Sequence, residues 1–204
     1  RRFQAKAFVP RGIAYCTANY RLAPEFTIED AIADCRASIV WAYSHAEEYG
    51  CDRDRIYVCG NSAGGHLVGA VLADDWLDAA GLPSDVVKGG CALSGLFDLE
   101  PLLQTEANQW LKLDRLRARQ NSPIDYLRQT SADLVIGCGS EETGEFKRQS
   151  KIFADAWRAR GFPLTEIQPE GYNHYTIIGE TGRPGSIVFE SICAMIGVEG
   201  SGGL

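Results

Sequence analysis

The stretch RIYVCGNSAGGHLVGAVLA at 55–73 constrains the fold more than any other part of the sequence. It joins a short apolar run to a helix-forming segment through GNSAG at 60–64, which fits the pattern G-x-S-x-G. A serine on a sharp strand-to-helix turn has a strained backbone, and small neighbours let the strand and the helix approach closely. The stretch therefore predicts a strand, a tight turn that holds the Ser62 hydroxyl outward, and a helix.

Short apolar runs rich in β-branched residues and cysteine alternate along the chain with longer segments of helical period. Runs of this kind are typical of buried parallel strands. We expect strands at 12–20, 55–60, 89–95, 133–139 and 163–169. We expect helices at 62–73, 144–160 and 185–196. A further helix of about five turns should begin after Thr27, because Asp30 completes a capping box. This alternation predicts an α/β fold with a mainly parallel sheet.

The composition fits one domain over 1–204 that acts on a small molecule. With 204 residues, of which 45% are hydrophobic, the chain can bury one sizeable core. The net charge of −7 gives no basic face for nucleic acid, and no apolar stretch approaches the length of a membrane span. The seven cysteines form no C-x-x-C pair, which favours a reducing cytoplasm. We expect a small-molecule partner, no nucleic-acid or membrane partner and a flexible tail at 198–204; a homodimer stays open.

A serine nucleophile needs a general base, and the sequence holds only three histidines. His45 falls on a solvated face of the expected long helix. His66 lies one helical turn past Ser62, which carries its ring away from the hydroxyl, so we interpret it as a structural residue. His174 follows the last strand-like run in a polar loop, where a base that reaches the end of the sheet is expected. Chain order therefore favours His174, against the alternative of an ordinary surface residue.

The base in turn needs a carboxylate that orients it, placed between serine and histidine in sequence at the end of a strand. Glu141 and Glu142 both follow the fourth strand-like run, and the pattern alone does not separate them. Asp98 also follows a strand-like run, but an aspartate before Leu-Glu-Pro is typical of a helix or turn cap.

These residues predict acyl transfer by a serine nucleophile. Ser62 attacks an acyl carbonyl, His174 takes the proton, and the backbone N–H of Ala63 at a helix N-terminus stabilises the oxyanion. The alternative for 60–64 is an ordinary glycine-rich turn or a phosphate-binding loop, but neither glycine-rich nucleotide pattern is present. No histidine or cysteine spacing suits a metal site, and we expect no cofactor.

The sequence resembles α/β hydrolases of the arylformamidase (kynurenine formamidase) and esterase group, which is related to the hormone-sensitive-lipase-like enzymes. The matching stretches are NYRLAP at 19–24, GNSAGGHL at 60–67, LSGLFDLEPL at 93–102, NSP at 121–123 and EETGEFKRQS at 141–150. In that family the acid precedes a short x-x-E-F-x-R-Q-S segment, which places it on Glu142. The resemblance implies an α/β-hydrolase fold that hydrolyses an aryl formamide such as N-formylkynurenine, in tryptophan catabolism, without a cofactor.

The sequence departs from the family pattern in two places. Asn61 stands where many relatives carry histidine. The family also has a His-Gly-Gly loop that completes the oxyanion hole, and no Gly-Gly precedes Ser62 here. We therefore expect the C-terminal part of an N-terminally truncated α/β-hydrolase fold. Loss of one oxyanion donor lowers kcat by about 10²–10³, so we expect this chain alone to be weakly active or inactive.

The segment 102–123 has an amphipathic helical pattern, and we expect a cap-like insertion at about 96–123. Trp110 within it forms either an aromatic wall of the pocket or ordinary packing. Asn61 and Tyr175 are the other candidate pocket residues. Because sequence does not give pocket shape, a carboxylesterase acting on small or aromatic esters is an alternative function. A non-catalytic interaction module is a second alternative.

Overall fold

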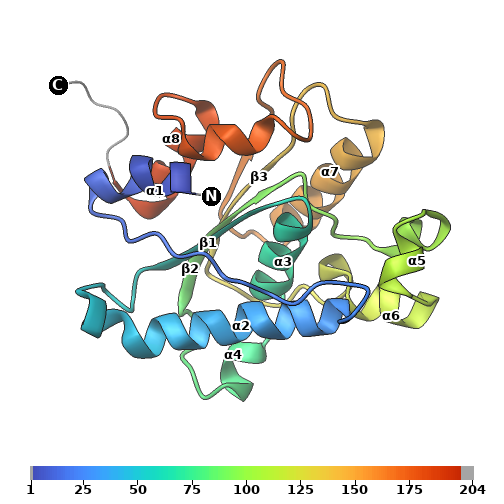
Figure 1. The fold of residues 1–204 in the computed structure, drawn as a ribbon, viewed down its shortest axis with the longest axis horizontal. Helices are drawn as coiled ribbons and strands as arrows, with labels where there is room; N and C mark the ends of the chain where they lie inside the picture. The colour runs from blue at the N-terminus through green and yellow to red at the C-terminus, as the bar shows by residue number, and fades with distance from the viewer. Residues whose placement is uncertain (1, 199–204) are drawn as a thin grey trace.

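Residues 2–198 are described by the computed structural model (Figure 1). Of the tail expected at 198–204, all but the first residue lies outside the described residues. The element order alternates strands with helices, so the α/β class predicted from the sequence is confirmed.

Four strands form one parallel sheet in the order β1-β2-β3-β4. They are β1 (Ile56–Asn61), β2 (Val87–Leu93), β3 (Asp133–Gly137) and β4 (Leu164–Ile167). These are the last four strands expected from the sequence, with small differences at their ends. Asn61 pairs with Leu93, which in turn pairs with Gly137, so the carboxyl ends of the first three strands are aligned. Residues that directly follow the strands therefore gather at one edge of the sheet.

Helices cover both faces of the sheet (Figure 1). They are α1 (Arg2–Phe8), α2 (Ile28–His45), α3 (Ala63–Leu72), α4 (Trp76–Ala79), α5 (Asn108–Leu111), α6 (Arg115–Gln120), α7 (Gly144–Ala159) and α8 (Ile187–Ile196). Short 3₁₀ turns are η1 (Val9–Arg11), η2 (Ala46–Tyr49), η3 (Glu100–Gln104), η4 (Pro123–Asp125) and η5 (Ile177–Gly182). Within 2–198, none of these helices has the length and apolar character needed to cross a membrane.

Side chains of the strands alternate between two cores, one on each face of the sheet. On β3, Leu134 and Ile136 belong to the larger core, which also contains residues of α2, α3, α4 and α7. Val135 between them belongs to the second core, with residues of α1 and α8. All three side chains are almost completely buried. Burial on both faces explains why three apolar residues follow one another in β3.

The long helix α2 begins where the capping box predicts. The Thr27 hydroxyl accepts a hydrogen bond from the Asp30 backbone N–H, and the Asp30 carboxylate accepts one from the Thr27 N–H. These two bonds satisfy N–H groups that have no partner within the helix. The helices expected at 62–73, 144–160 and 185–196 are confirmed as α3, α7 and α8.

The strand expected at 12–20 is wrong. The structure shows an irregular and largely exposed run between η1 and α2 (Figure 1). Among the described residues, β1 lies at the edge of the sheet, and this run does not pair with it. An apolar, β-branched segment becomes a strand only when a neighbouring strand exchanges backbone hydrogen bonds with it. The run at 12–20 therefore has the composition of a strand but does not pair with one in the described sheet.

The amphipathic helix expected at 102–123 is also corrected, because the structure divides this segment into η3, α5, α6 and the start of η4. Lys112 has the left-handed backbone of a helix end, with φ of 51°. Two residues on, the Asp114 carboxylate caps α6 by accepting a hydrogen bond from the Arg117 N–H. These two local signals end one helical turn and begin the next, which the hydrophobic pattern alone does not reveal.

Candidate active site

Ser62 lies on the turn between β1 and α3, with φ of 59° and ψ of −119°. This backbone conformation is rare for any residue other than glycine. The turn is tight: a Cβ added at Gly60 would lie 2.2 Å from the backbone O of Gly64, and one added at Gly65 would lie 2.6 Å from the O of Leu93. Backbone contacts therefore require glycine at position 60 of the G-x-S-x-G pattern and at position 65 just after it, whereas a Cβ at Gly64 would meet nothing within 4 Å. The strained turn brings the serine to the carboxyl edge of the sheet.

His174 meets Ser62 at this edge. Its Nε2 lies 2.9 Å from Ser62 Oγ, although 112 residues separate the two in the sequence. His174 belongs to the loop between β4 and η5, and its side chain is 22% exposed. The hydroxyl and the imidazole are thus within hydrogen-bond distance and open to an incoming small molecule.

Glu142 holds the other side of the imidazole. Its Oε2 lies 2.8 Å from His174 Nδ1, so the carboxylate accepts the Nδ1–H and leaves Nε2 to accept the Ser62 hydroxyl proton. The Glu142 side chain is completely buried. The neighbouring Glu141 is exposed, and its backbone N–H donates to the Tyr172 carbonyl. The structure thus brings Glu142, rather than Glu141, to the histidine.

Two further side chains contact this set and were not assigned to a site from the sequence. Ser94, directly after β2, donates from Oγ to Glu142 Oε1 at 2.5 Å. The Phe146 ring on α7 stacks on the His174 imidazole, with ring centroids 4.2 Å apart and planes 23° apart. The sequence carries a signal for Phe146 only in the family segment that follows Glu142. Nothing in the sequence pattern distinguishes Ser94 from other serines that follow strands.

The remaining candidates of the triad lie elsewhere. His66 on α3 is 3% exposed and donates from Nε2 to the Asn121 carbonyl, and burial lowers its pKa. His45 on α2 contacts the Trp41 carbonyl through Nδ1. Asp98 accepts a hydrogen bond from the Glu100 N–H and pairs with Arg148. The structural roles expected of His66 and Asp98 are therefore confirmed.

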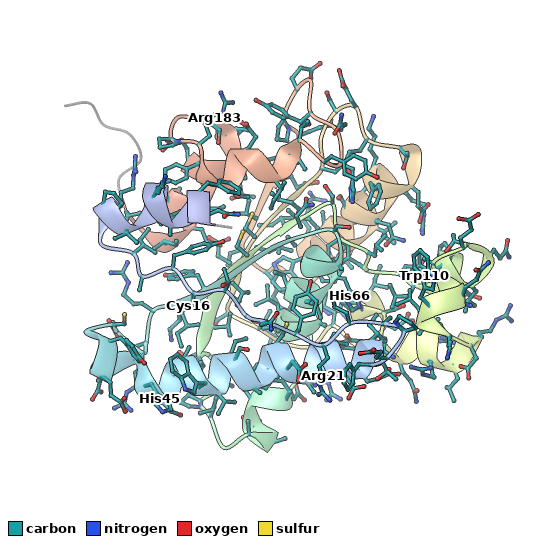
Figure 2. The ribbon with its side chains drawn as sticks, viewed as in Figure 1. Cys16, Arg21, His45, His66, Trp110 and Arg183 are labelled. Atoms are coloured by element: carbon teal, nitrogen blue, oxygen red, sulfur yellow. The ribbon has the colours of Figure 1, made fainter. Side chains whose placement is uncertain are left out.

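The candidate pocket residues differ in position. Asn61 ends β1 beside Ser62, and its buried Oδ1 has no hydrogen-bond partner among the described residues. Tyr175 is 85% exposed and presents its ring edge-on to His174, with centroids 5.7 Å apart. Trp110 lies on α5 at the outside of the molecule and is 59% exposed (Figure 2). Asn61 and Tyr175 thus adjoin the triad, whereas Trp110 belongs to the segment of short helices.

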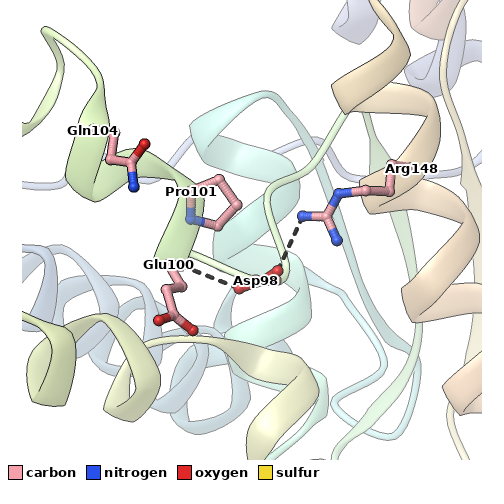
Figure 3. A pocket seen from close by; sticks show the side chains of 5 residues that line it. All are labelled: Asp98, Glu100, Pro101, Gln104 and Arg148. Atoms are coloured by element: carbon pink, nitrogen blue, oxygen red, sulfur yellow. Dashed lines mark hydrogen bonds and ion pairs between the residues drawn. The ribbon is translucent and has the colours of Figure 1, made fainter.

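A cavity of about 420 Å³ lies between this segment and α7 (Figure 3). Its lining residues are Asp98, Glu100, Pro101, Gln104 and Arg148. The Arg148 guanidinium pairs with Asp98 at 3.0 Å and with Glu145 at 2.8 Å, and these carboxylates raise the pKa of Arg148 above its usual range. No triad residue lines this cavity. Its polar contacts therefore fasten the start of the segment to α7 rather than contribute to the triad.

A serine hydroxyl, an imidazole and a buried carboxylate in a hydrogen-bonded row can carry out nucleophilic acyl transfer. The N-terminus of α3 directly follows Ser62, and a helix N-terminus favours negative charge. Within the described range, no group of three or more His, Cys, Asp or Glu side chains has the geometry of a metal site.

A parallel sheet that carries a serine on a strand-to-helix elbow, followed in sequence by the acid and the histidine, defines the α/β-hydrolase class. A hyperthermophilic esterase from the archaeon Pyrobaculum calidifontis has the same fold: its structure superposes with a TM-score of 0.77 at 19% identity, covering 95% of this chain and 69% of that one. The chain belongs to the BD-FAE family, whose model matches residues 2–156.

Two curated relatives agree with the resemblance found in the sequence. A kynurenine formamidase from Danio rerio is 29% identical over 203 residues, which is 96% of this chain and 66% of that protein. An arylesterase from Saccharolobus solfataricus is 50% identical over 61 residues, 29% of this chain and 20% of that protein. The chain thus spans about two thirds of the length of the kynurenine formamidase. The assignment to an arylformamidase and esterase group of α/β hydrolases is confirmed.

Proposed function

We propose that this protein is a serine hydrolase in which Ser62, His174 and Glu142 form the catalytic triad. The observation that carries the proposal is the continuous row of hydrogen bonds from Ser62 Oγ through both ring nitrogens of His174 to Glu142 Oε2, at 2.9 and 2.8 Å. The three side chains come from parts of the chain that only the folded sheet brings together. Similarity to formamidases and esterases supports the same chemistry.

The mechanism follows from this geometry. Ser62 Oγ attacks the substrate carbonyl carbon while His174 Nε2 takes its proton, and the Ala63 N–H stabilises the oxyanion of the tetrahedral intermediate. The intermediate collapses when His174 gives the proton to the leaving amine or alcohol, which leaves the acyl group on Ser62. Water, deprotonated by His174, then attacks the acyl-enzyme, and His174 returns the proton to Ser62 Oγ as the acid is released. Glu142 stabilises the imidazolium in both halves of the reaction.

The first substrate class is an aryl formamide such as N-formylkynurenine, with formate as the released acid. The relative that aligns with nearly the whole chain is a kynurenine formamidase, which supports this choice. A formyl group is the smallest acyl group and needs little room beside the nucleophile. The aromatic rings of Phe146 and Tyr175 next to His174 offer an apolar surface to an aryl leaving group.

The second candidate is a carboxylic ester with a small or aromatic group. A stretch of 61 residues that is 50% identical to an arylesterase favours this candidate. The triad performs both reactions, because each passes through the same tetrahedral intermediate. Discrimination between the two therefore lies in the pocket rather than in the reacting groups.

The described thiols support a reducing compartment. Cys16, Cys35, Cys51, Cys91, Cys138 and Cys193 form no disulfide bond. Disulfides are rare where glutathione and thioredoxin keep thiols reduced. We therefore propose a cytoplasmic protein that participates in tryptophan catabolism if its substrate is the formamide.

Steady-state kinetics test the proposal. We expect only weak hydrolysis of N-formylkynurenine and of p-nitrophenyl acetate by this chain alone, with both activities lost in Ser62→Ala. Ser44→Ala is the control, because Ser44 on the exposed side of α2 bonds only to the Val40 carbonyl. A higher kcat/KM for the formamide supports the first candidate, and a higher value for the ester supports the second. Hydrolysis that persists in Ser62→Ala contradicts the triad.

A further inference from the structure

We propose that Ser94 is a positioning residue that fixes the carboxylate of Glu142 for its contact with His174. This inference rests on the proposed function, because it assigns a fourth side chain to the same triad. The supporting observations are the hydrogen bond from Ser94 to Glu142, the burial of both side chains and the backbone conformation of Ser94.

The backbone around Ser94 is attached to both neighbouring strands. Its N–H donates to the Gly137 carbonyl at the end of β3, at 2.7 Å. The carbonyl of the preceding Leu93 accepts the Ser62 N–H at 2.9 Å. One peptide segment thus connects the turn that carries the nucleophile to the strand that leads to the acid. Backbone hydrogen bonds therefore hold Ser94 at the end of β2, between the strand that leads to Ser62 and the strand that leads to Glu142.

The Ser94 hydroxyl completes the hydrogen bonds of the acid. Glu142 Oε1 accepts from Ser94 Oγ at 2.5 Å and from the Gly139 N–H at 2.9 Å. Its other oxygen, Oε2, faces His174. Because Ser94 and the Glu142 side chain are completely buried, water is not available to replace a lost donor. With two donors on Oε1, the carboxylate cannot rotate without breaking a buried hydrogen bond.

The backbone conformation of Ser94 indicates that its hydroxyl has a specific role. Its φ is 48°, in the left-handed region that favours glycine. Glycine is readily accommodated by such a backbone, whereas serine is strained there. The gain that offsets this strain in the structure is the bond to Glu142. Ser62 follows β1, Ser94 follows β2 and Glu142 follows β3. Together with His174, which follows β4, they form a row that runs from Ser94 through Glu142 and His174 to Ser62.

The test begins with Ser94→Gly, which removes the hydroxyl and suits the observed backbone. We expect kcat to fall about tenfold, because a hydrogen bond to a charged group is lost, while KM stays within about twofold. Ser186→Ala is the matched control: Ser186 is a buried serine whose hydroxyl, like that of Ser94, donates one hydrogen bond, and it lies at the start of α8, where it also accepts one from the Phe189 N–H. It should lower the melting temperature and leave kcat unchanged.

A double-mutant cycle separates positioning from a general structural role. If Ser94 acts through Glu142, then Ser94→Gly in the background of Glu142→Gln should change kcat by less than about twofold. A full tenfold loss in that background overturns the proposal, as does an unchanged kcat for Ser94→Gly in the native background. Circular dichroism melts confirm that each variant is folded.

An NMR measurement distinguishes failure of this inference from failure of the proposed function. Because the chain has only three histidines, ¹⁵N-histidine labelling gives a simple spectrum, in which His174→Gln identifies the His174 resonances. We expect a His174 Nδ1–H protected from exchange in the native protein and in Ser186→Ala, and faster exchange in Ser94→Gly. If the exchange behaves so but no substrate is hydrolysed, the positioning role stands and the proposed function fails. Equal exchange in the native protein and Ser94→Gly overturns the positioning role.

Discussion

The carboxyl edge of the sheet and the segment of short helices at 96–123 differ in how their residues are held. At the edge, Glu142 is buried and has three hydrogen bonds, and Ser62 lies on a turn fixed by close backbone contacts. In the segment, Trp110 and Leu116 are 59% and 65% exposed. Local strain and satisfied polar groups define the first region, whereas apolar surface is only partly covered in the second.

This difference has consequences for function. A buried carboxylate with all its partners has one arrangement, because any movement leaves a donor or acceptor unpaired. A segment of short helical turns with exposed apolar side chains is restrained by fewer such contacts. We therefore expect small changes at the sheet edge to have large effects on catalysis, and large changes in the segment to have small effects.

The largest effect is expected for Glu142→Gln. The amide keeps the size of the side chain but no longer stabilises the imidazolium or sets the tautomer of His174, so kcat should fall about 10⁴-fold. Glu141→Gln is the matched control, since Glu141 is the exposed neighbour. Steady-state kinetics of both variants give the comparison. An equal loss in the two variants would mean that Glu142 has no special role.

A smaller effect, on stability, is expected where the segment is anchored to α7. Gln149 is 1% exposed and accepts hydrogen bonds from the Phe97 and Asp98 N–H groups, while it donates to the Asp98 carbonyl. Gln149→Ala leaves these buried groups unpaired and should lower the free energy of unfolding by about 2–4 kcal/mol. Urea denaturation measures this, with the exposed Gln109→Ala as control. Equal midpoints for the two variants would show that the anchor is dispensable.

The hydrogen bond from His66 on α3 to the Asn121 carbonyl should make the free energy of unfolding depend on pH. Burial holds the pKa of His66 below its ordinary value of 6.5, against the opposing effect of its bond to the Asn121 carbonyl. As the pH falls, the His66 imidazole therefore binds a proton at a higher pH in the unfolded chain than in the folded one. The His66 contribution is present above about pH 6.5 and is lost as the pH falls below it, by up to about 1.4 kcal/mol per pH unit.

Urea denaturation between pH 5 and 8 measures this slope. His66→Gln should reduce it, because the variant removes the buried imidazole. If the slope is the same in His66→Gln and in the native protein, the charging of His66 is not responsible for it.

The smallest effect is expected for Trp110→Ala, which should change the free energy of unfolding by less than about 0.5 kcal/mol. The same variant tests whether Trp110 lines the pocket. A rise in KM for N-formylkynurenine without a change for p-nitrophenyl acetate indicates an aromatic wall, and no change in either indicates ordinary packing. Leu116→Ala serves as the control for loss of exposed apolar surface. If Trp110→Ala lowers the free energy of unfolding by several kcal/mol, the contrast between the sheet edge and the segment is wrong.

The sequence predicts the sheet edge well because its signals are local. Gly60 and Gly65 follow from backbone contacts within the turn and with β2, and the parallel strands follow from short apolar runs. Elimination among three histidines was enough to select His174. The choice of Glu142 over Glu141 came from family resemblance, and the structure supplies its reason, since only one of two adjacent side chains can face the histidine.

Other features depend on contacts that no local pattern encodes. The segment 12–20 has the composition of a strand, but pairing requires a neighbour, and none pairs with it in the described sheet. The break near Lys112 comes from a left-handed residue that is neither glycine nor asparagine, so the usual helix-end signal is missing. The bond from Ser94 to Glu142 joins residues 48 positions apart through a backbone conformation that the sequence does not announce.

The most direct test of the central claim is covalent labelling by a fluorophosphonate probe, followed by mass-spectrometric identification of the modified residue. Such a probe reacts with a serine that a neighbouring base activates. The account predicts labelling at Ser62 in the folded protein, little labelling in His174→Gln and none in Ser62→Ala. A folded protein that is not labelled at Ser62, or is labelled equally in His174→Gln, would contradict the claim that these side chains form a working triad.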